Sequence, residues 1–311
     1  MQLCRFSEDR LGLVEGDIVY DVSAALGAIP RQGWPLAFGD PLITHLDLVR
    51  DHIGQIRANA PKIDIATVQL SSPVAWPAKI MAAPANYRAH VEQDTQDPGV
   101  DQGVHRSAFL TVERPVDTYG LFLKASSSIV GPAEGIELPF SDRRSDHEVE
   151  LAVIIGKRAR HVSRDEAMRY VAGYSIGLDI TVRGSEDRSY RKSADSFAVL
   201  GPWLTTADEI DDPEDLELWL KVNGEPRQRS STGKMTVGIA DLIEVASRIY
   251  TLYPGDIIMT GTPEGVGPIA PGDTIRAGCA KIGSMTIGVR GSSDVEPARE
   301  SRMADRVEAE P

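Results

Sequence analysis

The most regular alternation of polar and apolar residues in the chain lies in SDHEVELAVIIGK, residues 145–157. Because successive side chains of a strand point to opposite faces, a strand over 148–155 directs Glu148 and Glu150 to one face. Val149, Leu151 and the apolar residues that follow at the same spacing then pack on the other face. The pattern predicts two carboxylates side by side at the start of a buried strand.

Strand patterns also dominate the N-terminal third. QLCRFSEDRLGLVEGDIVYDVS alternates in short segments that are separated by Gly12 and by a turn at residues 15–17, which predicts a hairpin meander. Apolar residues at helical spacing predict a helix over 41–60. We therefore expect a small β-rich module at the N-terminus, and a mixed α/β fold that is mainly β.

Two further helices are predicted in the second half of the chain. Ser163 followed by Glu166 forms a capping box, so a helix is expected from there to about Val171, with a strand over 175–180 behind it. Residues 239–252 have a strong amphipathic pattern that Pro254 and Gly255 close.

Proline residues punctuate a boundary near residue 75, because Pro61, Pro73 and Pro77 follow the first predicted helix. A loop rich in Gly and Asp, residues 94–106, has the composition and length of a lid. The C-terminal segment is charged and poor in large apolar residues, so we expect it to be disordered. The expected organisation is an N-terminal module at 1–74, a larger domain at 75–291 and a disordered tail at 292–311.

Composition narrows the classes of function. The chain has 311 residues, 41% of them hydrophobic, and a formal net charge of -13. This charge argues against a nucleic-acid or anionic membrane partner, and the start of the chain resembles no secretory leader, so we expect a cytoplasmic protein. Cys4 and Cys279 have no metal-ligand spacing and are expected to be reduced.

The paired acids predict a particular kind of chemistry. Neighbouring carboxylates raise each other's pKa unless a cation compensates them, so Glu148 and Glu150 indicate a metal or a shared proton. The alternative is a half-exposed strand whose acids face water. Asp179, at the end of the strand that follows, is a third carboxylate. An all-oxygen set would favour Mg²⁺, Mn²⁺ or Ca²⁺ over Zn²⁺.

Seven motifs follow one another over roughly residues 75–291. They are NY-x-x-H at 86–90, HEVELAVIIGK at 147–157, VAGYSIGLDIT-V-R at 171–183, KS at 192–193, LGPW at 200–203, VNGE at 222–225 and PGDIIMTGTPEGVG at 254–267. This ordered set resembles the fumarylacetoacetate hydrolase family. The resemblance implies a mixed β-sandwich roll, a homodimer, and a divalent metal on Glu148, Glu150 and Asp179.

The same resemblance implies roles for other side chains. His90 matches the general base of the family, and Lys192 matches a lysine that donates to a developing oxyanion. Arg183 matches a residue that can hold a substrate carboxylate. Without the resemblance, His90 would be interpreted as a hydrogen-bonded loop histidine. Three more residues are placed in the substrate pocket by resemblance: Tyr87, which the pattern alone would assign to packing, Lys124 and Thr262.

The chain departs from the family pattern at two places. The family usually has an acid three residues after the histidine, whereas here Glu92 comes two residues after it and Gln93 takes the third position. An extended segment would bring Glu92 to the side of His90, and a helical turn would bring Gln93 there. We favour Glu92 as the supporting acid. The family's R-D-x-Q also reads Arg183-Gly184-Ser185-Glu186, which predicts altered substrate contacts.

These features predict a metal-dependent hydrolase that cleaves a C–C bond in a small anionic 1,3-diketone or acylpyruvate. The cofactor is expected to be Mg²⁺, with Mn²⁺ or Ca²⁺ as alternatives. Two other functions stay open. An isomerase or a decarboxylase of 2-oxo acids could use the same metal site, and a catalytically weakened member could bind a ligand without turning it over.

Overall fold

The computed structural model describes residues 1–94, 96–97 and 112–292. Most of the expected lid at 94–106 and of the expected disordered tail at 292–311 lies outside the described residues, so both expectations stay predictions. None of the helices in the described part of the chain is long and apolar enough to span a membrane.

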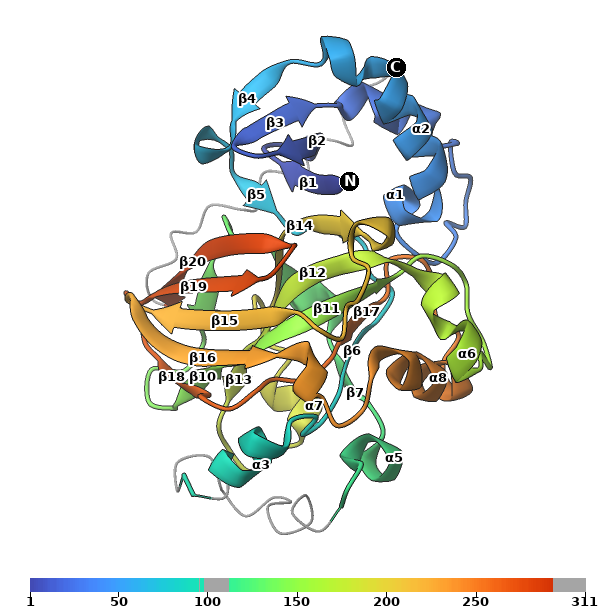
Figure 1. Ribbon diagram of the computed structural model, residues 1–311. Coiled ribbons are helices and arrows are strands. Elements are labelled where there is room, and N and C mark those ends of the chain that lie inside the picture. Colours follow the sequence, from blue (N-terminus) through green and yellow to red (C-terminus); the bar gives the residue numbers. More distant parts are fainter. Residues whose placement is uncertain (95, 98–111, 293–311) are drawn as a thin grey trace.

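A large mixed sheet runs through the whole molecule (Figure 1). Two short strands pair at its side, β5 (Leu70–Ser71) with β1 and β8 (Ile129–Val130) with β14. From one edge to the other the strands are β4 (Lys62–Asp64), β3 (Ile18–Asp21), β2 (Arg10–Glu15), β1 (Gln2–Phe6), β14 (Ala198–Thr206), β12 (Val171–Asp179), β11 (Val149–Ile155), β17 (Ile257–Met259), β6 (Ile80–Ala82) and β7 (Phe122–Lys124).

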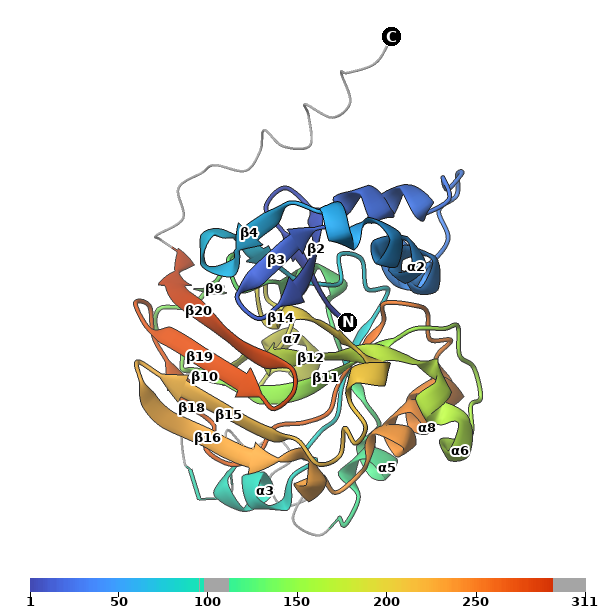
Figure 2. The same ribbon diagram turned by 45° about the horizontal axis from the view of Figure 1, so that its top comes forward.

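Two smaller sheets complete the β structure. The five-stranded sheet contains β16 (Glu225–Ser231), β15 (Glu217–Val222), β19 (Thr274–Cys279), β20 (Gly283–Gly291) and β9 (Ile136–Leu138), and the three-stranded sheet contains β13 (Thr181–Val182), β10 (Ser145–His147) and β18 (Gly267–Ile269). Figure 2 shows β15, β16, β19 and β20 side by side. Leu151 of β11 and Leu220 of β15 belong to one buried cluster, so this sheet packs on the large one as in a sandwich.

The strand with the paired acids is buried on both faces. Leu151 and Val153 pack in the cluster between the sheets, whereas Ala152 and Ile154 pack in a second cluster that includes Val49 of helix α2 (Leu46–Ile56). The alternative of a half-exposed strand is therefore wrong. Glu150 lies near the start of β11 and Glu148 comes directly before it, whereas the rest of that face is covered by the N-terminal module.

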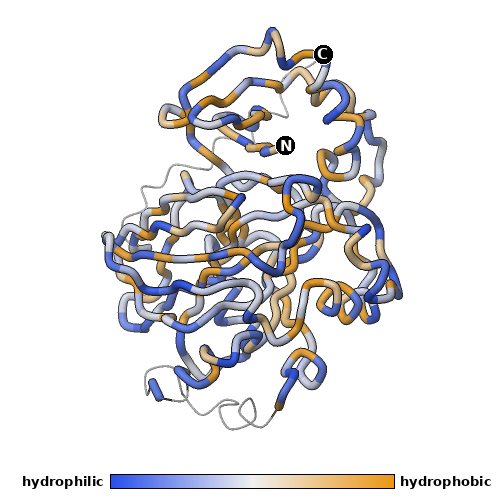
Figure 3. Tube along the Cα trace, in the orientation of Figure 1, coloured by the Kyte–Doolittle hydropathy of each residue, from blue (hydrophilic) through white to orange (hydrophobic). Residues whose placement is uncertain are grey.

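The helices are short and lie around the sheets. They are α1 (Pro41–Thr44), α2 (Leu46–Ile56), α3 (Arg88–Asp94), α5 (Pro115–Tyr119), α6 (Arg164–Ala167), α7 (Arg188–Arg191) and α8 (Ile239–Ile249). Single 3-10 turns occupy Ser23–Ala28, Arg57–Asn59, Ile65–Thr67, Ser126–Ser128, Met168–Tyr170, Ala207–Glu209 and Thr232–Lys234. Hydrophobic and hydrophilic residues alternate along α8, as its sequence predicted (Figure 3).

Two helix predictions need correction. The helix expected over 41–60 breaks at His45, whose backbone has φ -114 and ψ 25, so α1 and α2 are separate. Ser163 stands at the N-cap of α6, but its side chain makes no capping hydrogen bond, and the helix continues only as a 3-10 turn. Strand β12 then begins at Val171, earlier than residue 175, because it pairs along its length with β11 and β14.

The N-terminal meander joins the larger domain through main-chain hydrogen bonding. Leu3 of β1 pairs with Leu204 of β14, so the large sheet is continuous across the expected boundary. The carboxylate of Asp40 accepts from the N–H groups of Ile43 in α1 and of Ala75 beyond the boundary. The division at residue 74/75 stays a prediction.

Candidate metal centre and active site

Three carboxylates meet where β11 begins and β12 ends. The two strands are antiparallel, and the N–H of Asp179 donates to the carbonyl of Glu148 at 2.9 Å. This pairing brings together residues that lie 31 positions apart in the chain. One carboxylate oxygen from each of Glu148, Glu150 and Asp179 lies within 4.8 Å of the others, and all three residues are buried. The group predicted from the sequence is therefore assembled by the fold.

Two buried lysines compensate this negative charge. The ammonium of Lys192 donates to Glu148 at 2.7 Å, to Asp179 at 2.8 Å and to the hydroxyl of Thr181. The ammonium of Lys124 donates to Asp179 and to the carbonyl of Lys192. Both predicted lysines thus lie at the site. In this arrangement the three N–H groups of Lys192 are directed at the protein's own oxygens.

The electrostatics of the three acids are unequal. Burial and the charges of Asp179 and Glu148 raise the pKa of Glu150 well above its ordinary value. Burial would also raise the pKa of Glu148, but Lys192 and Arg183 outweigh it and hold that pKa below its ordinary value. Close carboxylates cannot all be ionised at no cost without a further cation, so the donor set fits a divalent metal.

In the described part of the chain, the loop after β17 supplies a main-chain N–H donor to one of these acids. The N–H of Gly261 donates to Glu150 at 2.6 Å. Gly261 has φ +97, and a Cβ there would lie 2.7 Å from the Cβ of Asn86, so only glycine fits. The amide of Asn86 in turn bonds to the main chain of Val237 and Thr260, which fixes the turn. The glycine-rich motif TGTPEGVG therefore forms a loop beside the site.

His90 lies on α3 and is 7% exposed. It is close enough to Glu148 to contribute to the lowered pKa of that carboxyl, after Lys192 and Arg183. Tyr87, one turn earlier, is buried, and within the described residues its hydroxyl has no hydrogen-bond partner. Burial and the charge of Glu150 raise the pKa of Tyr87. Both side chains lie at the site that the sequence assigned to them.

Residues 88–94 form a helix and not the extended segment that would bring Glu92 to the side of His90, and the catalytic role of Glu92 itself stays a prediction. The side chain of Glu92 is 59% exposed and pairs with Arg88 at 3.4 Å. Gln93 does not take its place. Its amide donates to the carbonyl of Val266 at 3.1 Å and accepts from the N–H of Gly265 at 2.5 Å. Gln93 therefore connects the helix of His90 to the loop whose Gly261 binds Glu150.

This geometry predicts opposite outcomes for two neighbouring substitutions. We expect Gln93→Glu to lower kcat about tenfold, because a carboxylate cannot donate to Val266 and leaves that carbonyl unpaired, at a cost of about 1–3 kcal/mol. Glu92→Gln, the matched control, should change kcat less than about twofold, since an exposed ion pair contributes little. Steady-state kinetics of both variants would check this. A Gln93→Glu enzyme faster than the wild type would show that an acid at this position serves the base.

Two residues that were predicted to bind the substrate, Arg183 and Thr262, form hydrogen bonds within the protein. Arg183 donates to Asp146 at 2.7 Å and to Glu148 at 3.5 Å, so the carboxylates that it holds here are the protein's own. The hydroxyl of Thr262 donates to the carbonyl of Val149 at 2.9 Å and accepts from Gln228. Both therefore hold β10 and β11 in place, and their contact with a substrate stays a prediction.

Sequence reasoning missed four residues of the site. Asp146 could have been found, because it continues the spacing of Glu148 and Glu150 by one more alternate position. Thr181 follows Asp179 at the same spacing. Arg188 and Arg191 lie three apart in one helical turn, a pattern that carries no signal without the fold.

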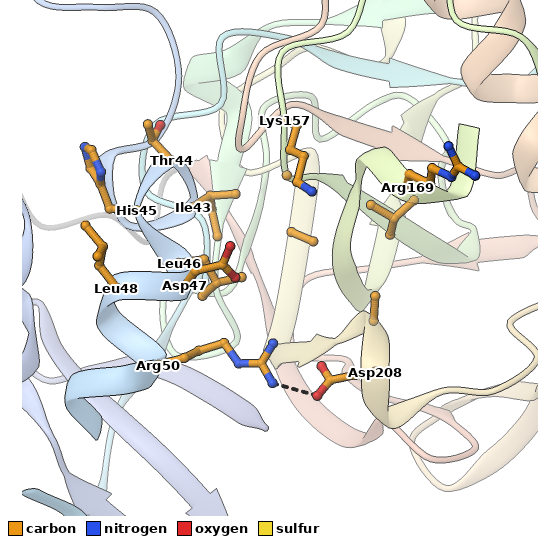
Figure 4. Close-up of a pocket in the computed structure, with 14 residues that line it drawn as sticks. Ile43, Thr44, His45, Leu46, Asp47, Leu48, Arg50, Lys157, Arg169 and Asp208 are labelled. Atoms are coloured by element: carbon orange, nitrogen blue, oxygen red, sulfur yellow. Dashed lines mark hydrogen bonds and ion pairs between the residues drawn. The ribbon is translucent and has the colours of Figure 1, made fainter. Parts of the chain in front are cut away.

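A cavity of about 430 Å³ lies apart from this site. It is bordered by α2 and by the chain after β11, and an ion pair of 2.6 Å joins Arg50 to Asp208 across it (Figure 4). Lys157 and Arg169 also line it. The cavity shares no residue with the carboxylate group.

Comparison with known proteins agrees with this geometry. The chain is 51% identical over 290 residues to a protein of Aquipseudomonas alcaligenes described as maleylpyruvate hydrolase, covering 93% of this chain and 99% of that one. A maleylpyruvate hydrolase from Sphingobium sp. SYK-6, solved in complex with manganese(II) and pyruvate, has 39% identity and a TM-score of 0.77, with 94% and 99% coverage. A 5-carboxymethyl-2-hydroxymuconate delta-isomerase from Mycobacterium smegmatis has 31% identity and a TM-score of 0.67, with 94% and 100% coverage.

The family described as "Fumarylacetoacetate (FAA) hydrolase C-terminal" matches residues 79–290, which include all three carboxylates and both lysines. The match begins just before β6 and ends within β20. The chain belongs to the fumarylacetoacetate hydrolase family.

Proposed function

We propose that this protein is a divalent-metal-dependent hydrolase that cleaves the C–C bond of an acylpyruvate. The observation that carries the proposal is the group of three buried carboxylates, all of them oxygen donors and all within 4.8 Å. The hydrolase of Aquipseudomonas and the manganese and pyruvate complex of the Sphingobium enzyme support the same reaction. Maleylpyruvate, or a close analogue, is the substrate that these relatives favour.

Glu148, Glu150 and Asp179 would hold the metal, and Mg²⁺ and Mn²⁺ suit such a set. The bound metal supplies Lewis-acid chemistry to the neighbouring oxygens of the substrate. A homodimer, implied by the family resemblance, stays a prediction.

The chain's own residues carry out the proton transfers in this proposal. His90 takes a proton from water as it adds to the acyl carbonyl carbon, the general-base role that the family resemblance implies. Lys192 donates to the oxygen that becomes negative, for which one of its bonds to the protein must be exchanged. The C–C bond then breaks, and the methylene carbon that leaves takes up a proton to give pyruvate.

The isomerase from Mycobacterium smegmatis supports a second candidate function. On the same metal site, the reaction can end with enolisation of the substrate and without cleavage of the C–C bond. Product analysis separates the two. With Mn²⁺ and maleylpyruvate, we expect release of pyruvate and maleate in equal amounts, detected by chromatography. A shift between keto and enol forms with no pyruvate would favour the isomerase, CO₂ release would favour a decarboxylase, and no product together with saturable binding would indicate a weakened member.

A further inference from the structure

Helix α7 brings two arginines to the carboxylate site. Arg188 and Arg191 are three residues apart, so they lie on one face of the helical turn that ends just before Lys192. The guanidinium of Arg188 lies over the ring of Phe122 at 5.3 Å, and the ammonium of Lys192 lies over the same ring at 5.4 Å. Arg188 is therefore a neighbour of a lysine that bonds to two of the three carboxylates.

Some of the positive side chains in this region bond to carboxylates of the protein, and one does not within the residues that the structure describes. Lys192 and Lys124 bond to Glu148 and Asp179, and Arg183 bonds to Asp146. Arg191, in contrast, uses only its Nε among the described residues, on the carbonyl of Glu186 at 2.9 Å. Its two terminal nitrogens, which form the fork that suits a carboxylate, make no hydrogen bond within the described part of the chain.

Like charges are crowded here. Burial lowers the pKa of Arg191, and the charges of Arg183 and Arg188 lower it further. Burial also lowers the pKa of Arg188, although Glu148 and Asp179 act in the opposite direction. Half-buried guanidinium groups that repel each other are stabilised by an anion between them.

Hydrogen bonds from Arg143 fix the segment that precedes α7. Arg143 donates to the carboxylate of Glu186 at 2.9 and 2.8 Å and to the carbonyl of Arg183. Gly184 leaves room for this pair, since a Cβ there would lie 2.0 Å from a terminal nitrogen of Arg143. Arg143 therefore forms the ion pair with the carboxylate of Glu186, whose charge also acts on Arg191 and opposes the lowering of its pKa.

The geometry points to a second carboxylate subsite, formed by Arg188 and Arg191, for the end of the substrate that is remote from the metal. The inference rests on the proposed function and narrows it to acylpyruvates whose acyl part ends in a second carboxylate. Water adds to the acyl carbonyl carbon, the bond from that carbon to the methylene breaks, and the methylene takes a proton. The products are pyruvate and a dicarboxylate, and no oxidant or reductant is required.

The test compares two substrates of equal length that differ in one terminal group. Succinylpyruvate ends in a carboxylate and gives succinate and pyruvate, whereas butanoylpyruvate ends in a methyl group and gives butanoate and pyruvate. We expect the wild-type enzyme with Mn²⁺ to prefer succinylpyruvate in kcat/KM. Arg188→Gln and Arg191→Gln should each lower kcat/KM for succinylpyruvate roughly ten- to hundredfold, the scale of a lost charge-assisted bond, and change that for butanoylpyruvate less than about threefold.

Two controls accompany these variants. Arg169→Gln makes the same change of charge at an exposed arginine beside the separate cavity and should alter neither substrate. Arg191→Lys retains the charge without the fork, so it should recover part of the preference. Calorimetry of succinate and butanoate binding to the Mn²⁺-loaded enzyme gives a readout that does not depend on turnover, and succinate should bind more tightly.

The outcomes separate the two proposals. Equal losses on both substrates in the arginine variants would overturn the subsite and place these residues in the metal site or the fold. Cleavage of both substrates without preference by the wild type would overturn the subsite but leave the proposed hydrolase. If neither substrate is cleaved, the proposed function fails, and the subsite is then decided by calorimetry: equal binding of succinate and butanoate overturns it.

Discussion

Removal of divalent metal with excess EDTA is expected to abolish activity, and Mg²⁺ or Mn²⁺ should restore it. The reason is electrostatic, because Glu148, Glu150 and Asp179 are buried together and the pKa of Glu150 is already raised by burial and by its two neighbours. A cation bound only by the folded state also adds stability, about 2.7 kcal/mol when its concentration is 100 times Kd. Tm should therefore rise when metal is added to the stripped protein.

Glu150→Gln tests both readouts of this prediction. The variant keeps the size of the side chain and an oxygen for the N–H of Gly261, but it removes one ligand charge. We expect its activity to fall more than about a hundredfold and the rise of Tm with metal to shrink. Glu92→Gln, an exposed acid on α3, should keep the full metal response. Unimpaired turnover of the stripped wild type in EDTA would refute a metal-dependent reaction.

Lys192→Met should lower kcat about a hundred- to a thousandfold, the scale for loss of a donor to a developing oxyanion. The ammonium lies 2.7 Å from Glu148 and 2.8 Å from Asp179, so its removal leaves two buried carboxylates with less compensation. We expect the metal-free variant to be less stable than the wild type. Metal affinity should not decrease, since a positive charge that competes for the same oxygens is gone.

Kinetics and metal titration of Lys192→Met, measured together, test this assignment. Lys157→Met is the matched control, because Lys157 is exposed beside the separate cavity and should change neither quantity. If Lys192→Met lost metal binding and activity in parallel, Lys192 would be a support of the site and not a donor to the substrate. If it retained near-normal kcat, the role implied by the family resemblance would be wrong.

The sequence by itself determined the family and the three acids of the site. Glu148 and Glu150 could be placed together because the two-residue period of a strand is local and needs no knowledge of the fold. Asp179 could be named as a third carboxylate because it ends the strand that follows. His90 and Lys192 followed only from the order of motifs, since nothing in their own spacing relates them to the acids. The same two-residue period could also have identified Asp146.

Only the tertiary structure decided which residues surround the three acids and how they are oriented. Whether residues 88–94 are helical or extended could not be read from so short a segment, and the helix observed is held by Gln93 on a loop that lies 172 and 173 positions away in the chain. The charges of Arg183 and Arg188 act on Arg191 for the same reason: α7 is packed beside β7, where Phe122 lies. Contacts between distant segments depend on how strands pair and close-pack, and a pattern of neighbouring residues does not contain that information.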